Sequence, residues 1–358
     1  MKTKLLPLSV ILAGKLFAQD IHFSQFNEAP LQLNPALTGA VNSTRASLNY
    51  KDQWRSISTP YQTIAGSYEM RFNTNEWEKI PNKTKVYKLA QKRLSGGLSF
   101  FKDRAGDGNM GLTEILFSVS SAAPMDDQNT LVVGLQGGFA QQSINYAKLI
   151  FPEQYNGTGY DPAMANGEFF SSNTFYYADF SGGLAWLYKK EETKINENDL
   201  VKYTLGASVF HFNTPQQSFF GDGSQQLASR FMLHGLLEKG IKNTNVSVLP
   251  GFMMAFQGPA KEIMAGLMIK YRLGEDSKYT GYLKGANVSF GAYYRNRDAV
   301  VPNMLMEFGR CGIGLSYDLN FSNLTTASHS RGGLELMIKY VTPNPFMYQN
   351  SKPKFISR

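Results

Sequence analysis

Apolar residues alternate with small or polar residues along most of this chain, in segments of about ten residues that end at turns. One clear segment places Ile263, Leu267 and Ile269 on one face and Glu262, Lys270 and Arg272 on the other. Successive side chains of a strand point to opposite faces, so each segment has an apolar face and a polar face. The pattern predicts strands that separate an apolar environment from a polar one.

About fourteen such segments can be placed, and antiparallel pairing would close them into one sheet. They lie near residues 44–50, 61–72, 93–101, 111–121, 130–140, 174–188, 200–212, 229–239, 244–256, 261–272, 286–295, 299–309, 312–321 and 332–342. A closed sheet leaves no backbone group unpaired in lipid. We therefore expect an all-β fold: an antiparallel up-and-down transmembrane β-barrel of about 14 strands, in one domain over residues 19–342. A soluble β-sandwich adhesin or lectin is the alternative.

The first residues have the pattern of a secretory signal peptide. Lys2 and Lys4 precede an apolar run that ends at Phe17, and Ala18 is a small residue before the expected cut at Gln19. Residues 1–18 are therefore expected to be removed, although the cut could fall a residue or two away. A short buried helix is the alternative interpretation.

An even strand count places both ends of a bacterial barrel on the periplasmic side. The connections after odd strands would then be extracellular, namely residues 51–60, 102–110, 141–173, 213–228, 257–260, 296–298 and 322–331. The connections after even strands would be periplasmic, including the lysine-rich residues 73–92 and the charged segment from Lys189 to Asp199.

Two terminal segments lack strand periodicity. Residues 19–43 contain several large apolar side chains, among them Phe23, Phe26 and Leu31, and must bury them somewhere. We expect this N-terminal segment to fold back into the barrel mouth or lumen, either as a structural cap or as a contact for a partner. Residues 343–358 form a C-terminal tail after the last expected strand.

Composition agrees with a barrel and argues against other classes. Mean hydropathy is −0.28 and no apolar run of 18 residues follows the signal, so spanning helices are excluded. Net charge is +8 and falls to +5 when Lys2, Lys4 and Lys15 leave with the signal. No basic run of five or six residues occurs, so nucleic acid is not an expected partner.

The sequence contains no recognisable catalytic motif, so we expect no enzyme, no cofactor and no metal. The four histidines, His22, His211, His234 and His329, lack close metal-ligand spacing, and no GxSxG element is present. One partial calcium-loop pattern places Asp103, Asp107, Gly108 and Glu114 at loop positions one, five, six and twelve, but Ala105 fills position three. A Gly-rich hairpin turn is the favoured interpretation. The single Cys311 excludes an internal disulfide.

Several segments resemble one known family in their order along the chain. The start of the expected mature chain, QDIHFSQFNEAPLQLNPALTGA, carries an Asn-Pro-Ala element that ends in glycine, from Asn34 to Gly39. Further segments are NYKDQWR from Asn49, YQTIAGSYE from Tyr61, FFKDRAGDGNMG from Phe100, GLQGGFAQQSINY from Gly134, ASVFHFNTPQQSF from Ala207, YYRNRDAVVP from Tyr293, GLSYDLN from Gly314 and SRGGLEL from Ser330. Together they resemble the PorP/SprF family of outer-membrane proteins associated with the type IX secretion system. The tail and the lysine-rich connection have no counterpart in this pattern.

The resemblance implies a non-enzymatic accessory of type IX secretion in the outer membrane of a Gram-negative bacterium. Such a protein would support secretion or cell-surface attachment of a cargo with a C-terminal sorting domain, such as a gliding adhesin. Its partners would be this cargo, the secretion machinery and outer-membrane lipid. An outer-membrane porin or transporter for small or hydrophobic solutes is the alternative function.

Two groups of residues are candidate sites. Candidate partner-binding residues lie in or beside the expected surface connections and in the N-terminal segment: Trp54, Arg55, Phe219, Phe220, Arg295, Arg297, Asn34, Pro35 and Gly39. Candidate polar residues of the lumen are Arg230, His234, Glu238, Glu262, Lys270 and Arg272. For these, ordinary lumen packing between acids and bases is the alternative to a role in a pore or in binding the N-terminal segment.

Overall fold

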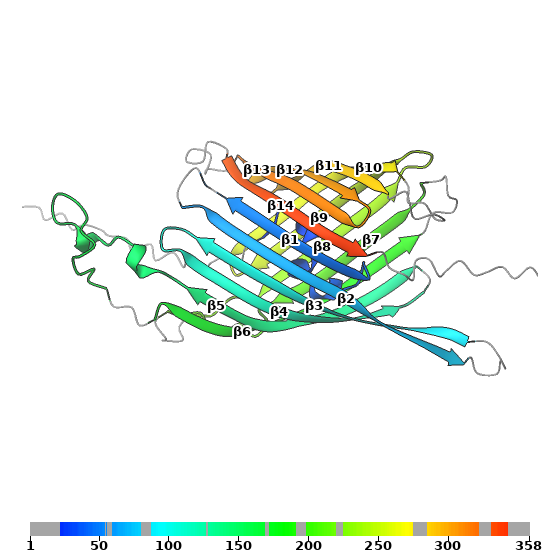
Figure 1. Cartoon of the computed structure of the whole chain (residues 1–358), viewed down its shortest axis with the longest axis horizontal. Coiled ribbons are helices and arrows are strands. Elements are labelled where there is room, and N and C mark those ends of the chain that lie inside the picture. Colours follow the sequence, from blue (N-terminus) through cyan, green and yellow to red (C-terminus); the bar gives the residue numbers. More distant parts are fainter. Residues whose placement is uncertain are drawn as a thin grey trace, which may run out of the picture.

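The computed structural model describes residues 22–53, 55, 59–79, 87–126, 128–168, 172–190, 198–219, 225–274, 285–321 and 331–342. Within them, fourteen antiparallel strands form one closed barrel, which confirms the predicted fold class (Figure 1). The strands are β1 (Thr44–Gln53), β2 (Tyr61–Lys79), β3 (Tyr87–Ala105), β4 (Met110–Pro124), β5 (Asn129–Ser143), β6 (Thr174–Lys190), β7 (Val201–Phe210), β8 (Arg230–Gly240), β9 (Val246–Gln257), β10 (Ala260–Gly274), β11 (Ala286–Arg295), β12 (Ala299–Phe308), β13 (Cys311–Asn320) and β14 (Arg331–Thr342).

Each strand pairs with its neighbours in sequence, and β1 pairs with β14 to close the barrel. The closing register runs from Thr44 opposite Thr342 to Gln53 opposite Gly333. The start of β1 and the end of β14 therefore lie at the same end of the barrel, which we call the terminal end. The opposite end, where β1 is followed by β2, is the loop end.

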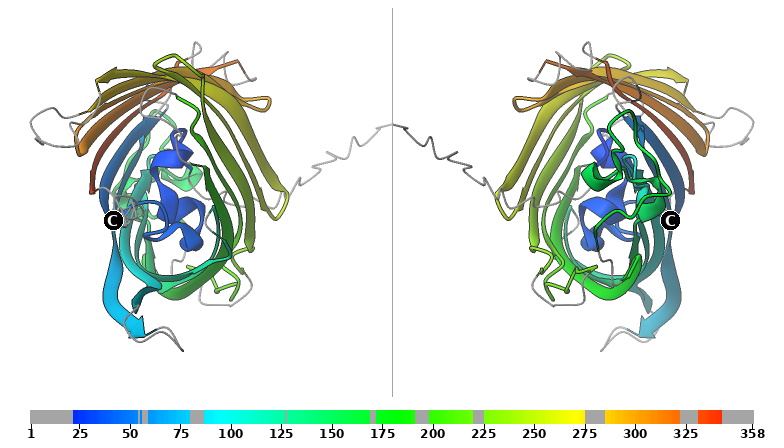
Figure 2. Two further views of the ribbon diagram at one scale, coloured as in Figure 1. Left: turned by 90° about the vertical axis from the view of Figure 1, so that its right-hand side faces the viewer. Right: turned by 90° about the vertical axis from the view of Figure 1, so that its left-hand side faces the viewer.

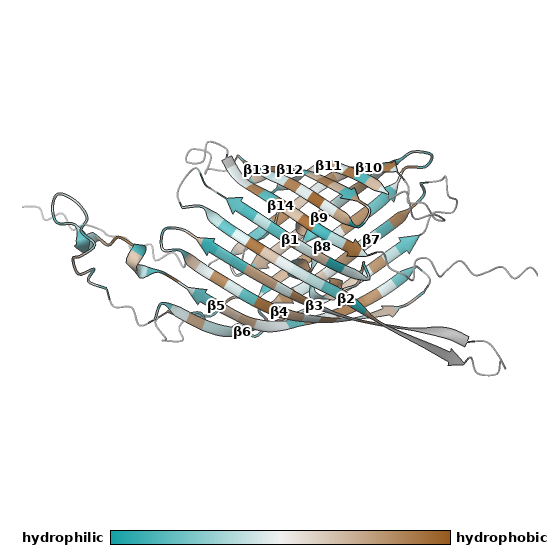
Figure 3. Cartoon of the chain, viewed as in Figure 1, coloured by the Kyte–Doolittle hydropathy of each residue, from teal (hydrophilic) through white to brown (hydrophobic). Residues whose placement is uncertain are grey.

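Alternation produces an apolar outer wall and a polar inner wall. On β13, Ile313, Leu315 and Leu319 are exposed on the outside, whereas Ser316 and Asp318 are buried inside. The hydropathy pattern in Figure 3 shows the same alternation on neighbouring strands. The outer apolar side chains are suited to contact lipid, because a charged side chain near the middle of the bilayer costs about 2–4 kcal/mol.

Two strands are much longer than expected. A strand needs about 9–11 residues to cross a bilayer, and β1 has 10, but β2 and β3 have 19 each. Residues Asn73–Lys79 pair with Tyr87–Arg93, so the expected connection at 73–92 is wrong over most of its length. The two strands project from the terminal end as a ribbon (Figure 1). Backbone pairing therefore continues beyond the strands that the alternation predicted.

The β3–β4 turn is also tighter than expected. Strand β3 continues to Ala105 and β4 begins at Met110, which leaves a turn of residues 106–109 with positive φ at Gly106 and Asn109. Asp103 lies within β3, where its side chain accepts a hydrogen bond of 2.8 Å from the Thr63 hydroxyl. The partial calcium-loop pattern therefore spans a hairpin, and its first residue bonds across the sheet.

The N-terminal segment, residues 22–43, lies inside the barrel, and we call it the plug (Figure 2). It contains three short elements, η1 (Phe26–Glu28), α1 (Pro30–Leu33) and η2 (Pro35–Leu37). Pro30 and Pro35 each begin a helical turn, and a proline cannot continue the helix before it. In the part of the chain that the structure describes, no helix is long and apolar enough to span a membrane.

The plug supplies much of the apolar core of the barrel. Phe26, Leu33, Ala36 and Leu37 form one cluster with wall residues, which are Val132, Ala185, Phe210, Met232, Met253, Ala255, Met264 and Tyr293. The Phe26 ring meets the Tyr293 ring edge to face at 5.2 Å. The large apolar side chains of the N-terminal segment are thus buried, as the sequence predicted.

Candidate functional site: the plugged lumen

The beginning of the plug is held at the loop-end half of the lumen by buried charged groups. The Glu335 carboxylate accepts hydrogen bonds from the backbone N–H of Ser24 at 2.8 Å and of Gln25 at 2.9 Å. The Ser24 hydroxyl donates to Asp318 at 2.7 Å and accepts from the Arg295 guanidinium at 2.6 Å. Arg295 also bonds Asp318 at 3.0 Å. Buried carboxylates need donors, and the plug backbone supplies two of them.

A second set of groups extends this charged anchor. The Lys51 ammonium donates to the His22 carbonyl oxygen at 3.0 Å and lies 3.8 Å from an Asp318 oxygen. His22 Nδ1 lies 3.2 Å from the Glu262 carboxylate. Burial, with the nearby Arg295 and Lys51 cations, holds the pKa of His22 well below its ordinary value. We call Ser24, Lys51, Arg295, Asp318 and Glu335 the charged anchor.

The middle of the plug is held by shape and by neutral hydrogen bonds. The Asn34 amide donates to the carbonyl oxygens of Leu184 at 2.9 Å and Ala207 at 3.3 Å, and it lies 3.1 Å from His234 Nε2. The Asn34 side-chain oxygen accepts from the Ala36 N–H at 2.9 Å and caps η2. This one side chain thus orders the plug and joins it to the wall.

Three wall glycines make room for this element. A Cβ atom at Gly183 or Gly206 would overlap the Asn34 side chain, and one at Gly134 would overlap the Pro35–Ala36 backbone. We call Gly134, Gly183 and Gly206 the glycine track. Because glycine lacks a Cβ, the plug backbone can approach the wall closely there.

The last part of the plug is fastened near the terminal end. The Gly39 N–H donates to Glu69 at 2.7 Å, and its carbonyl oxygen accepts from Arg71 at 2.6 Å. Gly39 has φ +56°, and a Cβ there would lie 2.6 Å from the Ser95 Cβ. Glycine is therefore required both by the backbone conformation and by the space available.

A series of alternating charges crosses the inner wall near the same end and includes the plug. Its successive members are Lys202, Glu238, Lys270, Glu307, Lys339, Glu28, Arg45 and Glu69, separated by distances from 2.8 to 4.0 Å. Glu28 is the only member that belongs to the plug among these residues, and it bonds both Lys339 and Arg45 at 3.0 Å. The plug thus completes a charge pattern of the wall.

The sequence from residue 15 to residue 340 matches the family described as type IX secretion system membrane protein PorP/SprF. This chain belongs to the PorP/SprF family. The match covers nearly all of the barrel and the whole plug, including the Asn34–Gly39 element that carried the resemblance. A comparison with curated proteins found no match.

Comparison with solved structures finds other barrels at low identity. A deltaS2 mutant of the monoaromatic hydrocarbon channel TodX is 11% identical, with a TM-score of 0.45 over 88% of this chain and 94% of that chain. The β domain of the Bordetella autotransporter BrkA is 12% identical, with a TM-score of 0.40 over 84% and 99%. BamA from Haemophilus ducreyi, lacking POTRA domains 1–3, is 8% identical, with a TM-score of 0.39 over 84% and 70%.

In this PorP/SprF protein, the residues expected in the lumen lie on inner faces of their strands. Arg230, His234 and Glu262 are buried, and Lys270 bonds Glu238 across the wall at 3.0 Å. Arg272 is half-buried on the same face as Lys270. The structure brings His234 to Asn34 and Glu262 to His22, whereas Glu238 and Lys270 belong to the series of alternating charges.

The expected partner-binding residues are found in different places. Asn34, Pro35 and Gly39 are inside the barrel, whereas Arg297 is exposed in the β11–β12 turn. The Arg55 side chain is 74% exposed and lies 2.5 Å from Asp52. Phe219 packs against Phe175 at 4.7 Å between ring centres. Trp54 and Phe220 lie outside the described residues.

Arg295 corrects an expectation. It was expected to contact a partner from the surface, but it is 3% exposed and faces the lumen as part of the charged anchor. Lys51, which was expected to begin a surface connection, is 1% exposed inside β1. The inward alternation of Arg45, Ser47 and Asn49 continues to Lys51, and this signal could have identified it.

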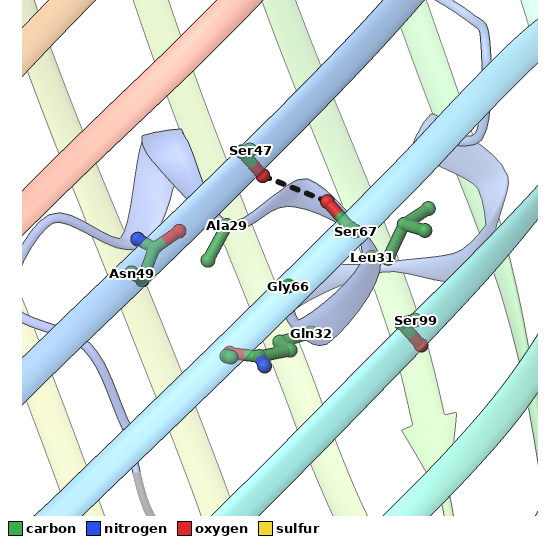
Figure 4. Close-up of a pocket in the computed structure, with 9 residues that line it drawn as sticks. Ala29, Leu31, Gln32, Ser47, Asn49, Gly66, Ser67 and Ser99 are labelled. Carbon is green, nitrogen blue, oxygen red and sulfur yellow. Dashed lines mark hydrogen bonds between the residues drawn. The ribbon is translucent and has the colours of Figure 1, made fainter.

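The plug leaves little open space along one wall. Figure 4 shows a pocket between α1 and strands β1–β3, lined by residues that include Gln32, Asn49 and Ser99. Its volume is about 10 Å³, which is close to the space that one water molecule needs. Among the described residues, no group of three or more His, Cys, Asp or Glu could hold a metal ion.

Proposed function

We propose that this PorP/SprF protein is a non-enzymatic accessory of type IX secretion in the outer membrane of a Gram-negative bacterium. It supports secretion or cell-surface attachment of a specific cargo with a C-terminal sorting domain, such as a gliding adhesin. Membership of the family supports the link to type IX secretion. The apolar outer wall and the polar inner wall support residence in a bilayer.

The observation that carries the accessory role is the plug. Fourteen strands enclose a lumen, and residues 22–43 occupy it with buried apolar and polar side chains. A diffusive porin needs a continuous aqueous path, whereas a protein that holds a partner needs only a stable scaffold. The extensive bonding of the plug to many strands therefore favours a scaffold over the alternative of a porin or transporter.

We further propose that the terminal end faces the periplasm and the loop end faces the outside. The expected export signal and the even strand count support this orientation. Cargo would then meet the connections of the loop end, where Arg55 and Arg297 are exposed. The machinery would reach the protein from the side of the β2–β3 ribbon.

A deletion tests the role of the plug. Removal of residues 21–38, with the signal and its cleavage site kept, should leave a barrel that inserts but no longer supports secretion or display of its cargo. In planar bilayers, the intact protein should show little conductance and the deletion variant a steady large one. Steady large conductance of the intact protein would instead support the porin alternative. Normal cargo display by the deletion variant would show that the plug is dispensable.

A further inference from the structure

The connection between β5 and β6 is a folded projection beyond the loop end of the barrel. Residues 144–168 of this connection, which we call the arm, extend along the barrel axis (Figure 1). The Ile144 N–H donates to the Asn173 carbonyl at 2.9 Å, and the Asn145 N–H donates to the Gly108 carbonyl at 2.8 Å. These bonds join the first residues of the arm to Asn173, just before β6, and to Gly108 in the β3–β4 turn. The arm therefore leaves the barrel in a defined direction.

The arm is organised around a glutamine rather than an apolar core. Gln154 is 8% exposed, accepts a hydrogen bond from the Phe151 N–H at 3.1 Å and donates to the Met164 carbonyl at 3.2 Å. Its own carbonyl oxygen accepts from the Asp161 N–H at 2.8 Å. A bridge joins Tyr155 to Tyr160. Polar groups thus shape the arm, and no apolar side chain is needed inside for this purpose.

Four large apolar or aromatic side chains of the arm are exposed. Ile150 is 68% exposed, Tyr155 51%, Tyr160 57% and Met164 39%. The two tyrosine rings lie 5.3 Å apart and present one joint surface. Clustered exposed apolar side chains mark docking surfaces, and tyrosine is frequent among the residues that dominate binding. Lipid does not account for this exposure, because the arm lies beyond the end of the barrel (Figure 1).

Charge restricts the chemistry of the partner. The arm carries Glu153, Asp161 and Glu168 against the single cation Lys148, although the whole chain has a net charge of +8. An acidic arm disfavours an anionic lipid surface and favours a protein surface whose apolar centre is bordered by lysine or arginine. Resting on the proposed function, we infer that the arm docks the secreted cargo protein through Ile150, Tyr155 and Tyr160, on a face of the cargo with basic borders.

The test compares cells that express arm variants with cells that lack this protein. A triple variant, Ile150→Ser with Tyr155→Ser and Tyr160→Ser, removes the apolar surface and leaves Gln154 intact. The matched control replaces three small exposed arm residues, Ala147→Ser with Ala163→Ser and Ala165→Ser. Surface proteins are quantified in a strain lacking this protein and in strains expressing each variant. Heat-modifiable migration and protease resistance of the arm verify folding.

One surface protein should be missing from the null strain. We expect the triple variant to reduce the surface amount of that protein by at least about tenfold, because each lost hot-spot side chain weakens binding. The control should retain it, and charge reversal by Glu153→Lys with Glu168→Lys should lower it too. Normal levels in the triple variant, with loss in the null strain, would overturn this inference and leave the proposed function intact. No loss in the null strain would overturn both.

A photo-crosslinking amino acid in place of Tyr160 identifies the occupant directly. We expect the crosslinked product to contain the same surface protein that the null strain loses. A product of two copies of this chain would assign the arm to self-association and overturn the inference. A product with lipopolysaccharide or phospholipid would also overturn it.

Discussion

Two of the attachments that hold the plug in the barrel depend on different kinds of interaction. At the loop-end half, Ser24 and Gln25 are held by the charged anchor, in which Arg295, Asp318 and Glu335 are each less than 4% exposed. In the middle, Asn34 is held by neutral hydrogen bonds and by the glycine track. The first attachment depends on a complete set of charges, and the second depends on empty space beside the wall.

This difference determines how each attachment can fail. A buried charge left without its partner is strongly destabilising, so we expect the loss of any one charged member of the anchor to lower the free energy of unfolding. The glycine track has no charge to lose, but an added side chain would fill the space that Asn34 occupies. The charged anchor is therefore sensitive to deletions of atoms, and the glycine track is sensitive to additions.

The largest effect is expected for Arg295→Met, which leaves the buried Asp318 carboxylate with the Lys51 ammonium at 3.8 Å and the neutral Ser24 hydroxyl at 2.7 Å. We expect the free energy of unfolding to fall by about 3–5 kcal/mol, because one partner of a buried ion pair is removed. Urea titration in detergent, followed by tryptophan fluorescence, measures this change. Arg295→Lys keeps the charge and should lose less. A loss below about 1 kcal/mol for Arg295→Met would show that the charged anchor is not needed.

A smaller loss is expected for Gly183→Val, which places a side chain where Asn34 lies. Overpacking costs typically about 1–3 kcal/mol, and here it should displace the plug. Protease digestion of the barrel in detergent should then cleave residues 22–43. Gly182→Val is the matched control, because a Cβ at this neighbouring residue would lie at ordinary contact distances, 3.4 Å from Leu135 Cδ2 and 3.8 Å from the Gly134 carbonyl oxygen. Equal plug cleavage in both variants would exclude the glycine track as the cause.

Asn34→Ala and Asn34→Asp separate the two roles of this side chain. Alanine removes all its hydrogen bonds and should cost about 1–3 kcal/mol in the same urea titration. Aspartate still accepts from the Ala36 N–H but cannot donate to the Leu184 carbonyl. If capping of η2 were the main contribution, Asn34→Asp would be close to the unaltered protein. We expect it to resemble Asn34→Ala instead.

The smallest effect is expected for Arg55→Ala, which tests an exposed ion pair against the buried ones. The Arg55 side chain is 74% exposed, and pairs of this kind contribute about 0–1 kcal/mol. The free energy of unfolding should therefore change little, and added salt should reduce the difference between Arg55→Ala and the unaltered protein further. A loss as large as that of Arg295→Met would contradict the contrast between buried and exposed charge.

The sequence by itself determined the class of fold and most of its strands. Alternation is a local property, because a wall with lipid on one side and a polar lumen on the other demands it at every second residue. Residues 311–320 could thus be oriented without knowledge of their neighbours. The plug was also predictable, because Phe23, Phe26 and Leu31 lie in a segment without strand rhythm and need burial.

Only the tertiary structure decided which residues meet. Ser24 bonds Glu335 across 311 positions of sequence, and this contact exists only because β14 closes against β1. Arg295 ends a strand beside a turn, so its sequence position indicated the surface. Strand alternation places it on the inner face with Tyr293, where it bonds Asp318 and Ser24. The extension of β2 and β3 also lacked a sequence signal, because backbone pairing outside the membrane requires no alternation. Local patterns record the environment of a residue, whereas its partners depend on closure of the barrel around the plug.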